Sequence, residues 1–286
     1  MRKVKFVIGV LAIVCAVLSI FFILSSEKAL VTHPKGIIAD GELSVIITNY
    51  LLMSIIILPT FIFLLVIAWK YNAKNAKAEY DPEHTGGVRG ELILWIIPSV
   101  VIVIMTFVTW KATHELDPYR PLKSEIDPLR IQVVALDWKW LFIYPEQGIA
   151  TLNFVQFPAG VPIHFSLAAD GSPMNSFWMP QLSGQIYAMT GMVTPLHIMA
   201  YETGEYTGRA AELNGRGYAG MTFLAKSTSQ SDFEDWIIAV KQSPLRLTDQ
   251  VYNNLVAPSE DNPIMLYSHV EENLFNKIVM KYSGLN

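Results

Sequence analysis

The feature that most constrains this chain is a set of three long stretches without charged side chains in its N-terminal part. They are residues 6–26, 43–69 and 92–110. An α-helix rises about 1.5 Å per residue and the hydrocarbon core of a bilayer is about 30 Å thick, so about 20 apolar residues cross it. Each stretch is long enough for one crossing. We therefore expect transmembrane helices over residues 43–69 and 91–110.

The first stretch supports two interpretations. A basic start followed by an apolar run is typical of a retained helix and also of a secretory signal peptide. Ser25-Ser26 before Glu27 is a weak version of a cleavage site. Cys15, the only cysteine of the chain, lies in the middle of the run, which argues against lipid attachment. Residues 1–26 are therefore expected to be either a cleaved signal or a third transmembrane helix.

Basic residues around these stretches predict the orientation of the chain. The expected cytoplasmic loop, residues 70–90, carries four of them, which are Lys70, Lys74, Lys77 and Arg89. Three more precede the first stretch, namely Arg2, Lys3 and Lys5. Only Lys28 and Lys35 lie between the first two stretches. Because Lys and Arg accumulate on the cytoplasmic side, we expect everything from residue 112 onward on the outer side.

Residues 112–228 have the pattern of a β-sandwich. Residues 131–136 have the pattern of a short strand with both faces at least partly buried, and apolar residues recur over 161–167 with the period of two expected of half-buried strands. Turn-forming residues at 158–160 and 170–173 separate such runs. The pattern predicts an α+β membrane protein with a transmembrane helical hairpin and an extracytoplasmic Greek-key sandwich.

Residues 229–286 are expected to form a C-terminal helical extension with loops. Ser231-Asp232-Phe233-Glu234 is typical of a capping box at a helix start. The net charge of −4 and the lack of a basic tract exclude nucleic acid as an expected partner. The six histidines show no spacing typical of metal ligands, and His164, on the polar side of an alternating strand, is expected to face solvent.

Three segments carry a resemblance to a known family. They are Asp137-Trp138-Lys139-Trp140, Asn175-Ser176-Phe177-Trp178-Met179-Pro180 and the loop 210–221, Ala-Ala-Glu-Leu-Asn-Gly-Arg-Gly-Tyr-Ala-Gly-Met. They resemble the aromatic segment and the two copper-ligand loops of subunit II of haem–copper terminal oxidases. The resemblance covers nearly the whole chain after the first stretch. It is closest to subunit II of the bacterial bo-type ubiquinol oxidases, and it implies a cupredoxin-like sandwich.

The ligand positions depart from the copper-binding members of that family. Their binuclear copper centre uses two bridging thiolates, two imidazoles, a thioether and a backbone carbonyl, because soft sulfur and nitrogen donors hold mixed-valence copper. The matching positions here are Asn175 and Tyr218 for the imidazoles, Ala210 and Asn214 for the thiolates, Met221 for the thioether and Glu212 for the carbonyl. The resemblance therefore implies a branch without this copper site, with no metal or other cofactor in this chain.

The resemblance also implies a function and partners. The complex would oxidise ubiquinol, reduce O₂ to water and pump protons, with haem and copper in subunit I. This chain would be a structural and assembly subunit without catalytic residues, beside subunits I, III and IV and membrane lipid. It would lie in the bacterial inner membrane as a multi-pass protein with its large domain in the periplasm. Whether the quinol is ubiquinol or menaquinol stays open.

Glu91 is the candidate residue for activity. It stands at the expected cytoplasmic start of the last transmembrane helix. In the family, the matching Glu lies at the entrance of the K proton channel of subunit I. The alternative is an acidic residue favoured at a helix N-terminus by the helix dipole alone.

Two alternative functions remain for the chain as a whole. One is a copper-containing cytochrome c oxidase subunit, which the missing cysteines disfavour. Another is a membrane-anchored binding or assembly module outside electron transfer. Within the domain, Trp138 and Trp140 fit core packing or contact with subunit I better than an electron-entry patch.

Overall fold

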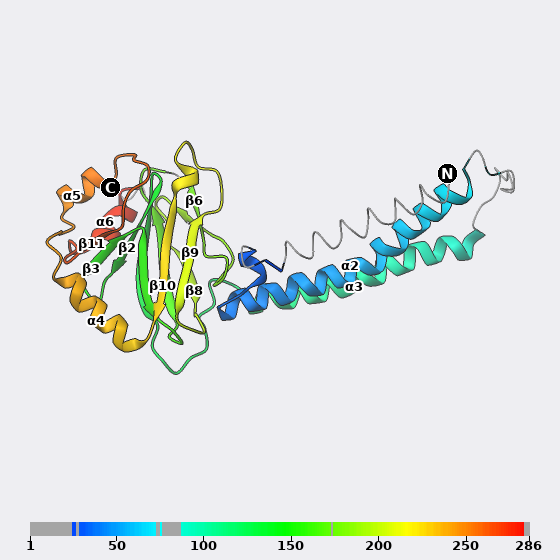
Figure 1. Ribbon diagram of the computed structural model, residues 1–286, viewed down its shortest axis with the longest axis horizontal. Coiled ribbons are helices and arrows are strands. Elements are labelled where there is room, and N and C mark those ends of the chain that lie inside the picture. The colour runs from blue at the N-terminus through cyan, green and yellow to red at the C-terminus, as the bar shows by residue number, and fades with distance from the viewer. Residues whose placement is uncertain (1–24, 27–28, 73–74, 76–86, 173, 283–286) are drawn as a thin grey trace. The chain divides into compact units, whose positions relative to one another are not determined.

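The structure is a computed structural model that describes residues 25–26, 29–72, 75, 87–172 and 174–282 (Figure 1). The chain divides into two compact units. One is helical and runs from Gly41 to Asp117, and the other combines Met1–Asp40 with Pro118–Asn286. The expected signal or first helix up to residue 24, Cys15 included, and most of the expected cytoplasmic loop lie outside the described residues.

The helical unit is formed by α2 (Ile37–Lys70) and α3 (Gly87–Glu115). Both are long and apolar enough to cross a membrane, and almost none of their side chains are buried within the protein. Apolar side chains left uncovered along a whole helix need an apolar solvent, which a bilayer supplies. Both helices extend beyond the uncharged stretches of the sequence, because charged side chains end a membrane-embedded segment without ending a helix.

The second unit is a sandwich of two β-sheets (Figure 1). In spatial order, the six strands of one sheet are β11 (Met265–Tyr267), β3 (Ile149–Leu152), β2 (Lys139–Tyr144), β1 (Leu129–Leu136), β5 (Ile163–Ala169) and β8 (Thr194–Ile198). The five strands of the other are β4 (Phe154–Pro158), β10 (Thr222–Thr228), β9 (Gly204–Ala210), β6 (Met174–Trp178) and β7 (Ile186–Met189). The expected sandwich is confirmed.

Aromatic rings fill the space between the sheets. Phe177 and Phe223 stack with ring centroids 5.0 Å apart, and Trp140 and Phe142 meet them edge-on or tilted. Such pairs stabilise a core by about 0.5–1.5 kcal/mol each beyond the burial of their area. Trp140 is fully buried, so its role is core packing, which is one of the two roles expected from the sequence.

The outer face of the six-stranded sheet has a second, smaller core. Val134, Leu136 and Leu141 are buried there beneath the C-terminal segment. The helices of this part are α4 (Gln230–Lys241), α5 (Asp249–Leu255) and α6 (Leu274–Met280). Figure 1 shows them gathered on the side of the sandwich where β11, β3 and β2 lie. Two 3₁₀ turns complete the elements, η1 (Leu30–Thr32) and η2 (Tyr218–Gly220).

Two details of the C-terminal part differ from the sequence expectation. Helix α4 begins at Gln230, one residue before the expected capping box, and its N-cap is Ser229, whose hydroxyl accepts a hydrogen bond from the Asp232 amide. In addition, Met265–Tyr267 forms strand β11 against β3, in a region expected to hold only helices and loops. Three residues are too short for a periodic pattern, so only the neighbouring strand reveals this element.

Candidate functional site

The six positions that match copper ligands gather at one end of the five-stranded sheet. Asn175 lies on β6, Ala210 ends β9, and Met221 immediately precedes β10. The amide of Ala210 donates to the carbonyl of Met221 at 3.0 Å, which closes the base of the loop 211–220. Two loops far apart in the sequence are thereby brought together.

Asn214 connects three of the six side chains. Its Nδ2 donates to Oδ1 of Asn175 at 2.5 Å and contacts Sδ of Met221 at 3.0 Å. Asn175 and Met221 are buried. In this amide pair, Nδ2 of Asn175 and Oδ1 of Asn214 are left buried without a partner among the described residues. A buried polar group without a partner costs about 1–3 kcal/mol, so the cluster is polar in a place where packing alone favours apolar groups.

Of the remaining three positions, Ala210 offers only a methyl group, and the side chains of Glu212 and Tyr218 bind elsewhere. The carboxylate of Glu212 is exposed and accepts a hydrogen bond from the hydroxyl of Tyr187, and this bond raises the pKa of that tyrosine. The hydroxyl of Tyr218 donates to the carbonyl of Ala211 at 3.4 Å, while its ring packs against the core. The cluster that actually meets is therefore Asn175, Asn214 and Met221.

Trp138 holds the loop 210–221 from outside. Its backbone has a positive φ of 61°, and the guanidinium of Arg216 lies 5.9 Å from the centroid of its ring. Arg216 also pairs with Glu260 at 2.5 Å. A Cβ on Gly217 would lie 2.5 Å from two carbons of the same ring, so the loop needs glycine there. Trp138 thus has a packing role, as expected.

A pair of histidines was missed by sequence reasoning. His164 is half-buried and its Nδ1 lies 2.7 Å from Nε2 of His197, so the expectation of a solvent-facing His164 is wrong. The two residues lie opposite each other on β5 and β8. The two histidines are 33 positions apart in the sequence, and only the register of the sheet brings them together, so the sequence alone does not predict their contact.

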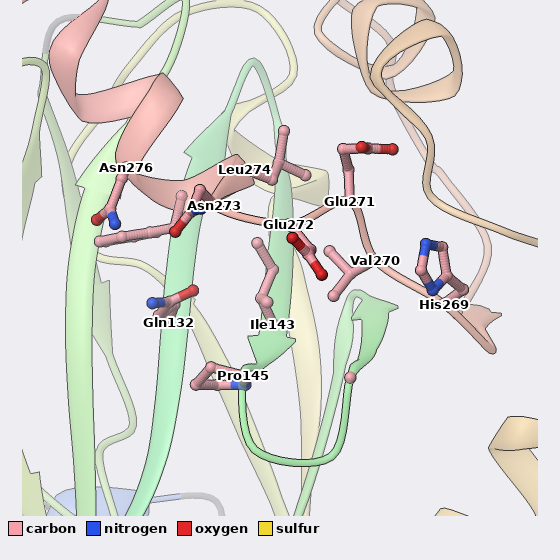
Figure 2. A pocket seen from close by; sticks show the side chains of 12 residues that line it. Gln132, Ile143, Pro145, His269, Val270, Glu271, Glu272, Asn273, Leu274 and Asn276 are labelled. Atoms are coloured by element: carbon pink, nitrogen blue, oxygen red, sulfur yellow. The ribbon is translucent and has the colours of Figure 1, made fainter.

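Two cavities lie on the outer face of the six-stranded sheet. Figure 2 shows the first, of about 530 Å³, where the side chains of Gln132, Glu272 and Asn273 surround the hollow between the sheet and the segment before α6. The second, of about 910 Å³, shares Gln132 and Pro145 with it and also contains the histidine pair. None of the six positions matched to copper ligands lines either cavity.

Comparison with known proteins identifies the family. The family model of the COX Aromatic Rich Motif matches residues 241–285. The cytochrome bo(3) ubiquinol oxidase subunit 2 of Pseudomonas putida is 48% identical over 253 residues, which are 88% of this chain and 80% of that protein. This chain belongs to the ubiquinol oxidase subunit 2 family.

A further sequence relative agrees with this assignment. The ubiquinol oxidase subunit 2 of Acetobacter aceti is 44% identical over 89% of this chain and 83% of its own length. Among solved structures, the periplasmic domain of subunit II of cytochrome oxidase of Bradyrhizobium japonicum covers 42% of this chain and 96% of its own, with 20% identity and a TM-score of 0.39. Membership makes this chain subunit II of a quinol oxidase, a membrane protein with an extracytoplasmic domain and other subunits as partners.

The donor groups of this family member do not fit a binuclear copper centre. The cluster offers carboxamides at Asn175 and Asn214, a methyl at Ala210 and a phenol at Tyr218, where thiolates and imidazoles are needed. Met221 alone retains a soft donor, and its sulfur contacts the amide of Asn214. One weak thioether and neutral amides cannot hold two copper ions.

Glu91 lies in the second turn of α3, which begins four residues before it at Gly87. Its side chain is exposed within the part of the chain that the structure describes. Its exposed position on α3 does not by itself give this side chain a role.

Proposed function

We propose that this chain serves a proton-pumping quinol oxidase as a subunit without a redox centre of its own. Electrons would pass from quinol directly to the haem and copper of subunit I, which carries the catalysis. The observation that supports this is the Asn175–Asn214–Met221 cluster, where hydrogen bonds occupy the place of metal bonds. Family membership supports the quinol as the electron donor.

The oxidase, with this chain as one subunit, would lie in the bacterial inner membrane. The sandwich and its C-terminal helices would lie in the periplasm, and the segment between α2 and α3 in the cytoplasm, in keeping with the basic residues at 70–90. Subunit I would be the main partner, with subunits III and IV and lipid around the helices. The exposed apolar side chains of α2 and α3 give these partners an apolar contact surface.

Purification of the intact complex tests the proposal. A mild-detergent preparation through a tag on this chain is expected to contain haem and to oxidise ubiquinol, and the isolated chain is expected to contain no copper and no near-infrared copper absorption. Purification without haem would favour the alternative of a binding or assembly module. Two copper ions per isolated chain would contradict the missing redox centre.

Glu91 is the proposed contribution of this chain to proton uptake, at the entrance of the K channel. A carboxylate at the end of a membrane helix is well placed to collect protons from water. Glu91→Gln removes its charge while keeping its shape, and Glu115→Gln at the other end of the same helix is a matched control. Slower turnover and proton release in the first variant alone is expected. Equal rates in both variants would assign Glu91 to the helix dipole.

A further inference from the structure

The histidine pair stands between the sheet and the segment that enters the domain after α3. His164 on β5 and His197 on β8 face each other with their ring centroids 4.6 Å apart. His197 is buried, with 8% of its surface exposed, and His164 is half-buried. Nδ1 of His197 lies 3.0 Å from the carbonyl oxygen of Pro118, and Nε2 of His164 lies 3.2 Å from Oγ of Ser166.

These distances fix which nitrogen carries each proton in the neutral pair. A carbonyl only accepts, so Nδ1 of His197 donates to Pro118. Nε2 of neutral His197 must then accept, and Nδ1 of His164 is the donor to it. Nε2 of His164 is left to accept from the hydroxyl of Ser166. Every polar atom of this four-membered chain is satisfied, with both imidazoles in the Nδ1–H form.

The spacing suits a proton better than a metal ion. Nδ1 of His164 and Nε2 of His197 are 2.7 Å apart, which is the length of a strong hydrogen bond. Two nitrogens bound at about 2.0–2.1 Å to a tetrahedral zinc ion are about 3.3 Å apart, so a metal would have to separate these rings. The pair is therefore built around a shared hydrogen atom.

Protonation changes the pair in two distinct steps. A first proton on His197 makes Nε2 a donor, and His164 can respond by moving its own proton to Nε2 and donating to Ser166. The chain of hydrogen bonds then survives with two bonds reversed, the one between the rings and the one to Ser166. A second proton leaves two N–H groups pointing at each other across 2.7 Å, with two like charges, and the contact must open.

The surroundings oppose this second proton. Burial is the main cause that lowers the pKa of His164 from its ordinary value of 6.5, followed by the charges of His197 and of Arg130, its register partner on β1. Asp127 and Glu146 are the acidic residues that line the same cavity, from the entering segment and from the turn after β2. A histidine with a lowered pKa in the folded state stabilises the fold above about pH 6.5 and loses that contribution as the pH falls through the folded pKa.

We propose that His164, His197 and the carbonyl of Pro118 form a proton-sensitive latch that holds the segment 118–128 against the outer face of the sheet. The latch is closed while the pair carries at most one proton. It opens when both imidazoles are charged, because two N–H groups then face each other across the contact. A domain on the side of the membrane to which protons are pumped would thereby sense local acidification, and only this last consequence rests on the proposed function.

Histidine NMR on the full chain in detergent tests the arrangement directly. With ¹⁵N-labelled imidazoles, both residues are expected in the Nδ1–H form at about pH 7.5, whereas free histidine prefers Nε2–H. Substitution of each residue assigns its signals, and His269→Gln is the control that leaves the pair intact. An Nε2–H form of His197, or two independent titrations near 6.5, would overturn the proposal.

Proteolysis tests the latch as a mechanical contact. Trypsin cleavage after the exposed Lys123 is compared with cleavage of a free peptide of residues 119–128 at each pH, which corrects for the pH dependence of the protease. His197→Leu is expected to raise this ratio about tenfold at about pH 7.5, which corresponds to the loss of one hydrogen bond of ~1.4 kcal/mol.

Substitution of His164 is expected to have the opposite effect on cleavage after Lys123. His164→Leu removes the facing N–H group but keeps the bond from His197 to Pro118, so cleavage is expected to stay low from about pH 7.5 to about pH 5. The unmodified chain is expected to show rising cleavage over the same range. Identical pH profiles in the unmodified chain and His164→Leu would contradict the latch, whatever becomes of the function of the complex.

Discussion

The hydroxyl of Tyr252 donates a hydrogen bond of 2.7 Å to Oδ2 of Asp170, across 82 positions of sequence. Lys281 and Tyr282 bind the other oxygen of the same carboxylate at 2.8 and 2.6 Å. Asp170 is 1% exposed and follows directly after β5. One buried charge on the sandwich therefore anchors both α5 and the end of α6, the segment that carries the aromatic-rich motif of the family.

Replacing this charge should loosen the C-terminal segment. Asp170→Asn keeps the shape but turns one acceptor into a donor that faces a hydroxyl or an ammonium group. Hydrogen bonds to a charged group contribute about 1.5–3 kcal/mol, so we expect the free energy of unfolding to fall by about 2–3 kcal/mol. Chemical denaturation of the full chain in detergent, followed by tryptophan fluorescence, measures the change. Tyr252→Phe, which removes one bond only, should cost about half as much.

The same carboxylate predicts a loss of stability in strong acid. Burial alone would raise the pKa of Asp170, but hydrogen bonds from Lys281, Tyr282 and Tyr252 hold it below its ordinary value of 3.8. Its contribution is therefore present above about pH 3.8 and is lost as the pH falls through the lower pKa of the folded state. Unfolding midpoints measured between about pH 5 and 2.5 should drop more steeply in the unmodified chain than in Asp170→Asn. Parallel curves would show that Asp170 is protonated alike in both states.

A single glycine limits the core between the sheets. A Cβ on Gly208 would lie 1.9 Å from Cζ of Phe223, whose ring stacks on Phe177 at an angle of 11°. Gly208→Ala must displace this ring, and overpacking of this kind costs about 1–3 kcal/mol. Thermal unfolding should register the loss. In a double-mutant cycle, Phe223→Leu should reduce the cost of the alanine, and simple additivity would exclude the clash as its cause.

The frame of the loop region predicts that copper binding can be restored. The imidazoles, thiolates and thioether that the centre needs are supplied by Met221 together with four substitutions, Asn175→His, Ala210→Cys, Asn214→Cys and Tyr218→His. We expect the fourfold variant to take up two copper ions and to absorb in the near infrared. The matched control leaves Ala210 unchanged and should lose the mixed-valence spectrum, because one thiolate cannot bridge the pair. A fourfold variant that folds yet stays colourless would show that the loop positions do not converge as described.

Much of the architecture was predictable from the sequence. Uncharged runs of about 20 residues have few stable solutions other than membrane helices, so residues 43–69 and 92–110 predict α2 and α3 directly. The pattern at 131–136 likewise predicts β1 as a strand with both faces at least partly buried, and the period of two at 161–167 predicts β5 as a half-buried strand. The motif at 210–221 was recognisable because its residues are contiguous. Strand β11 was missed because three residues are too few to show a periodic pattern. The N-cap of α4 was placed at Ser231 instead of Ser229 because local sequence does not distinguish between these two serines.

Local sequence thus determined where the chain meets the membrane, which segments form strands and which ligand types are present at the copper-loop positions. Tertiary structure alone decided which of those positions touch, that Asp170 holds the C-terminal segment, and that His164 faces His197. The physical reason is that helices and strands follow from patterns within one segment. A hydrogen bond between residues 33 or 82 positions apart depends on sheet order and register, which no single segment encodes.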